Sequence, residues 1–338
     1  MEKVTLSKRV MPVSRLAFGS LTLSPMQAAT PVERAADIIA YAFERGISFI
    51  DTAQYYNNYH IIRRAFEKYG KPDDVVLSTK TYAYDKSTAM AALEEARRET
   101  GRDVIDIFML HEQESYDTLR GHMEALDYFF ECRERGIIRA VGASMHHVAA
   151  VKGVMRLASA WGVQLDVIHP IYNKSGTGIV DGSLSDMADA VREAHDAGVG
   201  VFGMKALAGG HLCSSAAEAF DFVLDSGFID AVAVGMQSEA EVDANIEYFE
   251  RRCFSPDAKE RLAAKKRSLH VEEYCEGCGA CVDRCPVGAL SLVENTPSAE
   301  EAGEFSRTYT HRAVCDSEKC VLCGYCSGVC PVFAVKVY

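Results

Sequence analysis

One unit recurs eight times along the chain: a short apolar run followed by a longer amphipathic stretch. Short apolar runs predict buried strands, and stretches with an apolar residue every three or four positions predict helices packed on them. Regular alternation of the two is typical of a parallel sheet with crossover helices. The predicted strands are Leu16–Phe18, Ser48–Thr52, Val75–Thr79, Ile105–Leu110, Ala140–Ala143, Asp166–Pro170, Gly200–Met204 and Ala231–Val234.

A helix is predicted after each strand. The helices are Val32–Arg45, Tyr59–Tyr69, Thr88–Glu99, Gly121–Arg135, Val148–Ala160, Leu184–Ala197, Ala216–Ser226 and Glu239–Phe249. Several are followed by glycine, which favours the left-handed residue that ends a helix. Eight such units over about 250 residues predict an α/β fold, a (β/α)8 TIM barrel. A doubly wound open sheet is the alternative, but it usually has a glycine-rich dinucleotide loop, which Phe18-Gly19-Ser20-Leu21 lacks.

The C-terminal part has a different composition. Three of the twelve cysteines, Cys132, Cys213 and Cys253, precede residue 270, and all the others lie in the last 64 residues. Cytosolic thiols stay reduced, so their spacing points to metal binding before disulfides. We expect a barrel domain over residues 1–262 and a small metal-binding domain over 269–338, with a loop at 295–307 between two groups of cysteines.

The motif C-x2-C-x2-C-x3-C-P occurs twice, at residues 275–286 and 320–331. Three closely spaced thiolates can bind one face of a cuboidal cluster, while the fourth, followed by proline, reaches the partner cluster. A pair of zinc sites is the alternative, although zinc needs neither the third close cysteine nor the Cys-Pro pair.

The segment from Leu269 to Tyr338 resembles the bacterial two-cluster ferredoxins. The resemblance implies a small α+β ferredoxin-like iron-sulfur domain with two [4Fe-4S] clusters. It implies one cluster held by Cys275, Cys278, Cys281 and Cys330, and a second held by Cys320, Cys323, Cys326 and Cys285. The pattern leaves Cys315 unassigned, and we interpret it as a buried thiol or a bystander and not as a ligand.

Polar residues at strand ends matter most in a barrel, because barrel enzymes place their chemistry there. Asp51 and Tyr56 follow the second predicted strand, Lys80 ends the third and His111 ends the fourth. From Val4 to Glu250 the chain resembles the aldo-keto reductases, whose catalytic tetrad is Asp, Tyr, Lys and His in this order. The resemblance implies that Tyr56 donates a proton to a carbonyl oxygen. Lys80 would lower the tyrosine pKa, Asp51 would hold the lysine, and His111 would orient the carbonyl.

The resemblance also implies a nicotinamide nucleotide, with some departures from the family. The expected contacts are Gly19, Ser20, Ser144, His169, Asn173, Met204, Lys205, Gly235, Glu241 and Asn245. Met145 replaces the family's Asn, His169 its Gln, and Met204 its ring-stacking aromatic, while Lys205 could meet a phosphate or the substrate. Glu241 occupies the position at which a basic residue of the family would hold the 2′-phosphate of NADPH. A carboxylate there would repel the phosphate, so we expect NADH in preference to NADPH.

These features predict an iron-sulfur oxidoreductase that reduces a carbonyl, or oxidises an alcohol, with NAD(P)H. Hydride carries two electrons and a cluster one, so direct coupling needs a mediator such as a flavin or a redox-active substrate, although no flavin motif is evident. Two alternatives are a nicotinamide-independent reductase coupled to ferredoxin or flavin, and an electron-transfer component of a larger complex. The expected partners are the small-molecule substrate and an external carrier, either ferredoxin or a flavoprotein.

The net charge of -12 argues against nucleic acid and anionic membrane as partners, since both require a basic surface. The first twenty residues carry scattered charges and lack an apolar core of signal-peptide length. We therefore expect a cytoplasmic protein, and the oxygen sensitivity of such clusters suggests an anaerobe.

Overall fold

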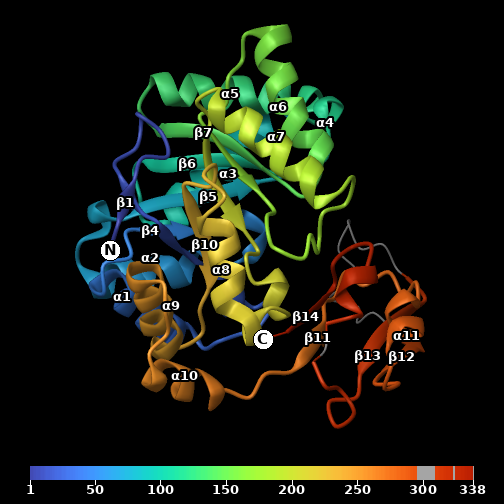
Figure 1. The fold of residues 1–338 in the computed structure, drawn as a ribbon. Helices are drawn as coiled ribbons and strands as arrows, with labels where there is room; N and C mark the ends of the chain where they lie inside the picture. The colour runs from blue at the N-terminus through green and yellow to red at the C-terminus, as the bar shows by residue number, and fades with distance from the viewer. Residues whose placement is uncertain (295–308, 323, 338) are drawn as a thin grey trace. The chain divides into compact units, whose positions relative to one another are not determined.

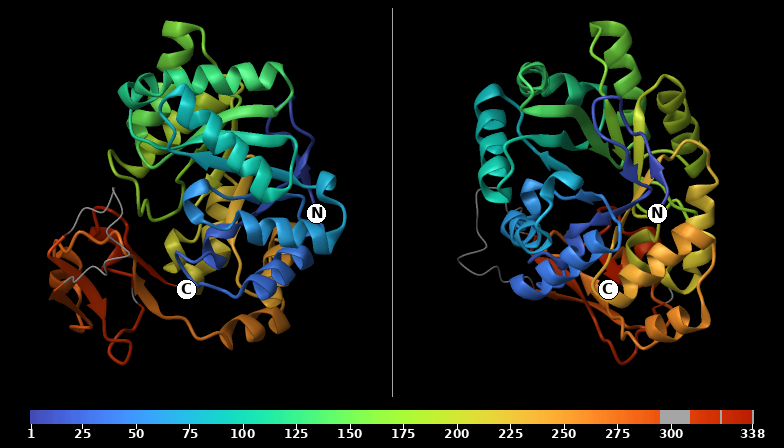
Figure 2. Two further views of the ribbon diagram at one scale, coloured as in Figure 1. Left: turned by 180° about the vertical axis from the view of Figure 1, so that it is seen from behind. Right: turned by 90° about the vertical axis from the view of Figure 1, so that its left-hand side faces the viewer.

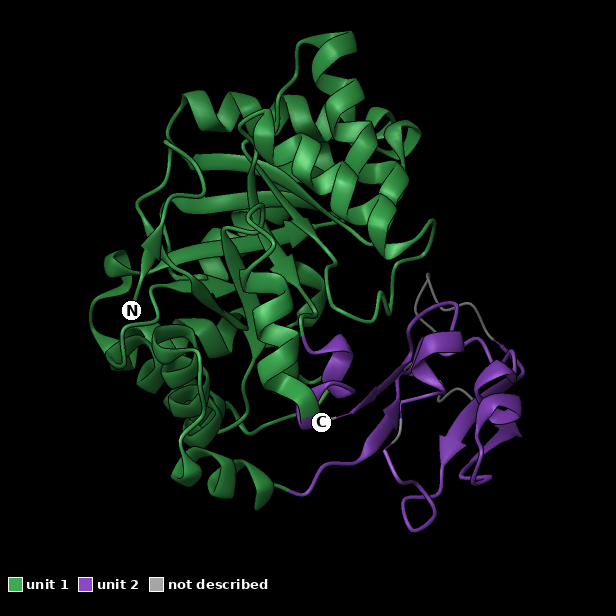
Figure 3. Ribbon diagram, viewed as in Figure 1, with its two compact units in different colours: residues 1–206, 215–265 green, residues 207–214, 266–338 purple. Residues whose placement is uncertain are grey.

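The computed structural model describes residues 1–294, 309–322 and 324–337 (Figure 1). The predicted loop at 295–307 and the predicted ligand Cys323 lie outside these residues. The chain divides into two compact units (Figure 3). The first comprises residues 1–206 and 215–265, and the second comprises residues 207–214 and 266–338.

The first unit is a closed barrel of parallel strands, in the order β10-β3-β4-β5-β6-β7-β8-β9. The strands are β3 (Leu16–Gly19), β4 (Phe49–Asp51), β5 (Val76–Thr81), β6 (Ile105–Gln113), β7 (Ile138–Met145), β8 (Val167–Pro170), β9 (Gly200–Met204) and β10 (Ala231–Gly235). Each overlaps a predicted strand, so the (β/α)8 prediction is confirmed. The open sheet is ruled out because β10 pairs with β3 and closes the ring.

The helices of this unit lie outside the ring of strands (Figure 2). They are α1 (Val32–Glu44), α2 (Tyr59–Tyr69), α3 (Lys86–Thr100), α4 (Tyr116–Gly121), α5 (Met123–Glu134), α6 (Val148–Trp161), α7 (Leu184–Asp196), α8 (Ala216–Leu224), α9 (Glu239–Arg251) and α10 (Pro256–Ala263). The sequence did not predict α4, which begins at a capping box between Ser115 and Thr118. Six residues are too few for a helical period to be recognised.

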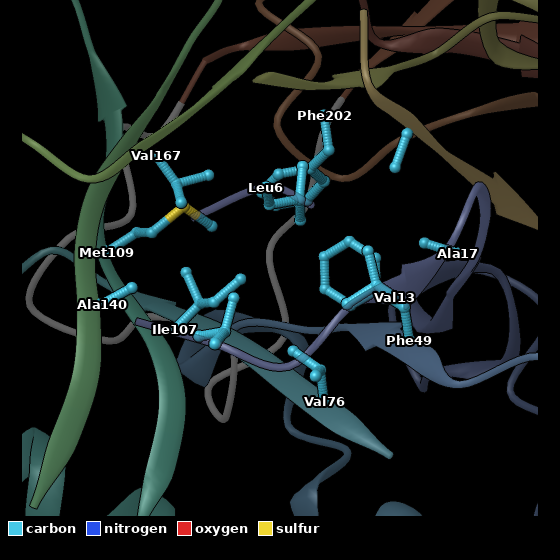
Figure 4. Packing of buried hydrophobic residues seen from close by; sticks show 12 residues of the cluster. Leu6, Val13, Ala17, Phe49, Val76, Ile107, Met109, Ala140, Val167 and Phe202 are labelled. Carbon is cyan, nitrogen blue, oxygen red and sulfur yellow. The ribbon is translucent and has the colours of Figure 1, made fainter. Parts of the chain in front are cut away.

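The apolar core of the barrel lies near the amino ends of the strands (Figure 4). Phe49, Val76 and Val167 each stand at or beside the first residue of a strand, and all belong to one buried cluster. A hairpin formed by β1 (Lys3–Val4) and β2 (Val13–Ser14) adds Leu6 and Val13 to the same cluster. This end of the barrel is therefore packed with apolar side chains, which leaves polar chemistry to the opposite ends of the strands.

The second unit has two small antiparallel sheets. Strand β11 (Leu269–Val271) pairs with β14 (Val335–Val337), and β12 (Leu290–Glu294) pairs with β13 (His311–Cys315). Short helices α11 (Ala280–Arg284) and η6 (Ser327–Val329) lie within the two cysteine motifs, each just before the fourth cysteine.

The segment 207–214 also belongs to this unit. His211 Nε2 lies 3.1 Å from the Val335 carbonyl oxygen. A Cβ atom on Gly210 would come within 1.9 Å of the Val337 carbonyl oxygen, so only glycine fits there.

Among the described helices, none has both the length and the apolar character that a membrane span requires.

Candidate active site and cysteine centres

Three of the four predicted catalytic residues stand on neighbouring strands. Asp51 is the last residue of β4, Lys80 is the penultimate residue of β5, and His111 lies near the end of β6. Tyr56 ends the short helix η2 (Gln54–Tyr56), which follows β4. Because β4, β5 and β6 are adjacent and parallel, the sequence spacing brings these residues to the same end of the barrel.

Asp51 and Lys80 form a buried ion pair, with 4% and 1% of their surfaces exposed. Lys80 Nζ lies 2.9 Å from Oδ1 and 2.8 Å from Oδ2 of Asp51, and 2.7 Å from the carbonyl oxygen of Thr52. An ammonium group has three hydrogens, so these three acceptors can take all of them. Lys80 Nζ is 5.3 Å from the centre of the Tyr56 ring and acts on it through its charge.

Asp51 has two further partners. The Ser78 hydroxyl donates to Oδ1 at 3.0 Å, and His169 Nε2 lies 3.5 Å from Oδ2. Burial opposes ionisation of Asp51, but the charges of Lys80 and His169 outweigh it and hold the pKa of the carboxyl below its usual range. Burial also lowers the pKa of Lys80, and the Asp51 charge only partly offsets this.

His111 packs among aromatic rings. Its ring centre is 5.7 Å from that of Tyr56, edge to face, and 4.6 Å from that of Tyr82, stacked. Burial is the largest influence on His111 and lowers its pKa to about 3, so the imidazole is neutral. Nδ1 is buried and has no hydrogen-bond partner among the described residues. The ring can therefore offer a hydrogen bond to a ligand.

A charged network not predicted from the sequence joins the ends of β6, β7 and β9. Glu112 accepts a hydrogen bond from the Tyr82 hydroxyl and has Oε1 3.8 Å from His146 Nδ1. His146 Nε2 lies 2.9 Å from Lys205 Nζ. Glu112 and Lys205 both have left-handed backbones, with φ of 46° and 58°. Such conformations are costly outside glycine and are concentrated at functional sites.

The residues expected to hold the nicotinamide amide have partners of their own. The Ser144 hydroxyl accepts a hydrogen bond from the Glu112 amide at 2.9 Å and retains its own hydrogen to donate. Asn173 Oδ1 accepts from the hydroxyl of Ser175, 2.8 Å away, and Nδ2 donates to the carbonyl of Thr177 at 3.0 Å. Asn173 therefore organises its own loop.

The predicted contacts after β3 and β10 lie side by side, since Gly19 pairs with Gly235. A Cβ atom on Gly235 would come within 2.3 Å of Thr22 Cγ2, so glycine at this position leaves room for the Thr22 side chain. Thr22 Oγ1 is buried without a partner in the described part of the chain. The predicted contact Ser20 accepts a hydrogen bond from Asn58 at 3.0 Å. Thr22 is thus a polar group that the sequence did not single out.

Glu241 lies in the first turn of α9 and is paired. Its Oε2 accepts the Gln237 amide hydrogen at 2.7 Å, and its Oε1 lies 2.8 Å from Lys265 Nζ. Asn245 lies one turn further along the same helix and is 8% exposed. Met204 ends β9 and is half-buried. A cation, Lys265, therefore lies beside Glu241 and is held by its carboxylate.

Seven cysteines of the second unit line two cavities. One cavity is lined by Cys275, Cys278, Cys281 and Cys330. The other is lined by Cys285, Cys320 and Cys326. Each cavity thus combines cysteines of one motif with the fourth cysteine of the other motif, the arrangement that the resemblance implies.

The electrostatics of these thiols suit a cationic core. Burial and then the neighbouring thiols raise the pKa of Cys281 to about 11, because several thiolates repel one another unless iron is present between them. Backbone amides point at the sulfurs that cross between motifs: Ala289 N lies 3.2 Å from Cys285 Sγ, and Ala334 N lies 3.2 Å from Cys330 Sγ. Such hydrogen bonds stabilise cluster sulfurs.

Cys315 lies near the second group. Burial first, and then a hydrogen bond with Cys320, raise the pKa of its thiol to about 12. It is not among the residues that line the cavity. The prediction that this thiol is buried is wrong, since Cys315 is half-buried, and its interpretation as a non-ligand stays a prediction.

A barrel with this polar tetrad, joined to a duplicated cysteine module, defines an iron-sulfur oxidoreductase. The sequence profile of the Aldo/keto reductase family matches residues 15–217, more than half of the chain, and that of the 4Fe-4S dicluster domain matches residues 274–334. The chain therefore belongs to the aldo/keto reductase family and carries a 4Fe-4S dicluster domain.

Two curated relatives divide between these parts. The "Aldo-keto reductase YhdN" of Bacillus subtilis is 27% identical over 188 residues, covering 51% of this chain and 54% of the relative. The "Uncharacterized polyferredoxin-like protein MJ1302" of Methanocaldococcus jannaschii is 34% identical over 67 residues, covering 19% of this chain and 37% of that protein. The chain thus spans about half, or less, of the length of these relatives.

The solved structure of the aldo-keto reductase AKR11C1 from Bacillus halodurans has a similar fold. The TM-score is 0.62 at 22% identity, with 78% of this chain and 95% of that one covered. This likeness supports the barrel fold.

Proposed function

We propose that this protein reduces a small-molecule carbonyl compound, or oxidises the corresponding alcohol, with NAD(P)H as the hydride donor. In this proposal two [4Fe-4S] clusters transfer electrons. The observation that carries it is the buried Asp51–Lys80 pair beside Tyr56, together with a neutral His111 whose Nδ1 has no partner in the described residues.

Each residue of the tetrad has a separate role in this reaction. A carbonyl oxygen gains negative charge as the carbon is reduced, and the Tyr56 hydroxyl donates its proton to that oxygen. The Lys80 cation favours the phenolate and so makes Tyr56 a stronger acid. Asp51 keeps the ammonium group in place, and the neutral His111 ring donates a hydrogen bond that orients the carbonyl oxygen. A bound reduced nicotinamide would supply the hydride.

The nucleotide fits part of the site. Buried Thr22 Oγ1 beside Gly235 needs a hydrogen-bond partner, and Ser144 has a hydrogen to donate to an amide oxygen. We expect Gly19, Ser20, Gly235, Glu241 and Asn245 to lie along the nucleotide.

The lining of the two cavities supports the assignment of the cluster ligands. Cys275, Cys278, Cys281 and Cys330 would hold the first, and Cys320, Cys323, Cys326 and Cys285 the second. Each cluster supplies one-electron transfer when bound.

A second candidate is a reductase that takes its electrons from the clusters, through a flavin or directly, with no nicotinamide. It is favoured by the partners that Asn173 and His169 already have, and by Met145 and Met204 at two positions where the family grips the nicotinamide. An external ferredoxin or flavoprotein would then be the electron source. We retain the prediction of a cytoplasmic protein from an anaerobe in either case.

The first experiment is anaerobic. The purified chain, with about eight irons, is mixed with NADH or NADPH, and the visible absorbance of the clusters is followed. Bleaching by one nucleotide supports the first candidate, and bleaching only by reduced ferredoxin supports the second.

Tyr56→Phe tests the acid, with Tyr55→Phe as the matched control because Tyr55 is the adjacent, exposed tyrosine. We expect carbonyl reduction to fall by a factor of about 10² to 10⁴ in Tyr56→Phe and to change little in Tyr55→Phe. Equal activities in the two variants would contradict the assigned role of Tyr56.

A further inference from the structure

His169 is a buried titratable residue that the reaction above does not use. It lies on β8 with 2% of its surface exposed, and its ring stacks on Phe202 with centres 3.9 Å apart. Its Nδ1 lies 2.6 Å from the Phe202 carbonyl oxygen, and its Nε2 lies 3.5 Å from Asp51 Oδ2. Both ring nitrogens therefore face oxygen atoms.

The two oxygens determine where the ring protons must be. A backbone carbonyl only accepts hydrogen bonds, so Nδ1 carries a hydrogen and donates it to Phe202. If Nε2 were bare, its lone pair would face the Asp51 carboxylate, and two acceptors would repel each other. A hydrogen on Nε2 turns this contact into an ion pair.

The acceptor capacity of Asp51 agrees with this assignment. A carboxylate has about four lone-pair sites. Lys80 occupies one on each oxygen, and the Ser78 hydroxyl occupies a second on Oδ1. The remaining site is on Oδ2, which is the oxygen that His169 faces.

We propose that His169 is a positioning residue of the tetrad. Its ring is a charged imidazolium and holds the Asp51 carboxylate through Oδ2. The other partners of Asp51, Ser78 and Lys80, lie on β5. This proposal rests on the proposed carbonyl chemistry for its kinetic consequence. Asp51, Lys80 and a charged His169 carry a net charge of one positive unit, whereas a neutral His169 leaves them with none. The extra cation favours the Tyr56 phenolate and strengthens the acid.

Few titratable groups lie close enough to His169 to influence its charge. Asp51 on β4, Lys80 on β5 and His111 on β6 are the titratable groups that act on it or are acted on by it. Ser144 on β7 pairs with it in the sheet and is neutral. Burial, the largest influence, and the Lys80 charge hold the pKa of His169 below its usual value, and the Asp51 charge and the Phe202 carbonyl offset them only in part. The contacts of both ring nitrogens with oxygen atoms oppose this direction. The proton on Nε2 therefore depends on Asp51.

Nitrogen NMR of the full chain, labelled with ¹⁵N-histidine, tests the charge directly at pH 7. His169→Gln identifies the signal, and His60→Gln, at an exposed position on α2, is the control. We expect both ring nitrogens of His169 to be protonated, and one to lose its proton in Asp51→Asn. A bare ring nitrogen in the wild type, or an unchanged ring in Asp51→Asn, would overturn the proposal.

Kinetics test the role in the tetrad. Glutamine can still donate a hydrogen bond to Asp51 but has no charge, so we expect His169→Gln to lower kcat about tenfold, the effect of roughly one pKa unit in the acid, with KM unchanged. The pH profile of kcat should also lose one inflection. Wild-type kcat and an unchanged profile in this variant would overturn the role. A wild type without carbonyl activity would contradict the proposed function, and the NMR result would still decide the charge.

Discussion

Breaking the Asp51–Lys80 ion pair by substitution should lower the stability of the barrel more than most other single substitutions. Lys80→Met removes the ammonium group and keeps the length of the side chain. It leaves the Asp51 carboxylate buried with Ser78 and His169 as its remaining partners. Removing one partner of a buried ion pair costs about 3–5 kcal/mol, because the other charge is left uncompensated away from water. Asp51→Asn should be costly for the same reason.

The double variant gives the interaction itself. Asp51→Asn with Lys80→Met removes both charges, so its cost should be about 1–3 kcal/mol less than the sum of the single costs. The matched control is Lys86→Met, which removes a lysine paired with Glu131 at 2.9 Å while both side chains are more than half exposed. Exposed pairs contribute about 0–1 kcal/mol, so this variant should be nearly as stable as the wild type.

Urea unfolding provides the assay. Trp161 is the chain's one tryptophan and belongs to the barrel unit, so its fluorescence reports on that unit, and circular dichroism follows the helices. If Lys80→Met proves no more costly than Lys86→Met, or if the two single costs simply add in the double variant, then the buried pair does not stabilise the barrel as argued here.

Three further predictions concern the clusters, the nucleotide and pH. Cys275→Ala and Cys330→Ala should each lower the iron content from about eight to about four per chain, and the double variant of these two should also hold about four. The double variant Cys275→Ala with Cys285→Ala should hold almost none. Equal iron contents and EPR signals in the two double variants would contradict the crossed ligation. Glu241→Ala removes the carboxylate that pairs with Lys265, so the lysine can contact a 2′-phosphate. The ratio of kcat/KM for NADPH to that for NADH should then rise about tenfold, the effect of one charged contact. An unchanged ratio in steady-state assays would contradict this. Burial lowers the pKa of His111 to about 3, so below pH 6.5 the unfolded chain binds a proton that the folded chain does not. The stability of the wild type relative to His111→Phe should therefore fall by about 1.4 kcal/mol per pH unit between pH 6.5 and 3, and parallel stability curves from urea unfolding would refute the assignment.

The barrel could be predicted from the sequence, and so could the meeting of Asp51, Lys80 and His111 at one end of it, because both follow from local order. Alternating apolar runs and amphipathic stretches fix the sequence of strands, and adjacent parallel strands bring Asp51, Lys80 and His111 to one end. The exchange of the fourth cysteine between motifs was likewise implied by a repeated local pattern. Such features need no knowledge of long-range register.

The features that escaped the sequence depend on contacts between distant strands or on unusual backbones. The network of Glu112, His146 and Lys205 requires left-handed residues at the ends of β6 and β9, which no residue type there announces. The position of His169 against Asp51 depends on how β8 faces β4 across the barrel interior. A polar residue at the end of a predicted strand was a signal for each, but it did not specify the partner.

The duplication of the cysteine motif bears on the mismatch between hydride and cluster chemistry. One cluster moves a single electron, so a single cluster could not balance a hydride without leaving a half-reduced partner. Two clusters in one unit can hold two electrons, the number in a hydride, and the two cavities share cysteines of both motifs. This count makes a two-electron exchange possible in either candidate reaction. If the barrel and the clusters share electrons, one equivalent of reduced nucleotide should therefore bleach both clusters of a chain. The final absorbance should equal that reached with two equivalents of a one-electron reductant.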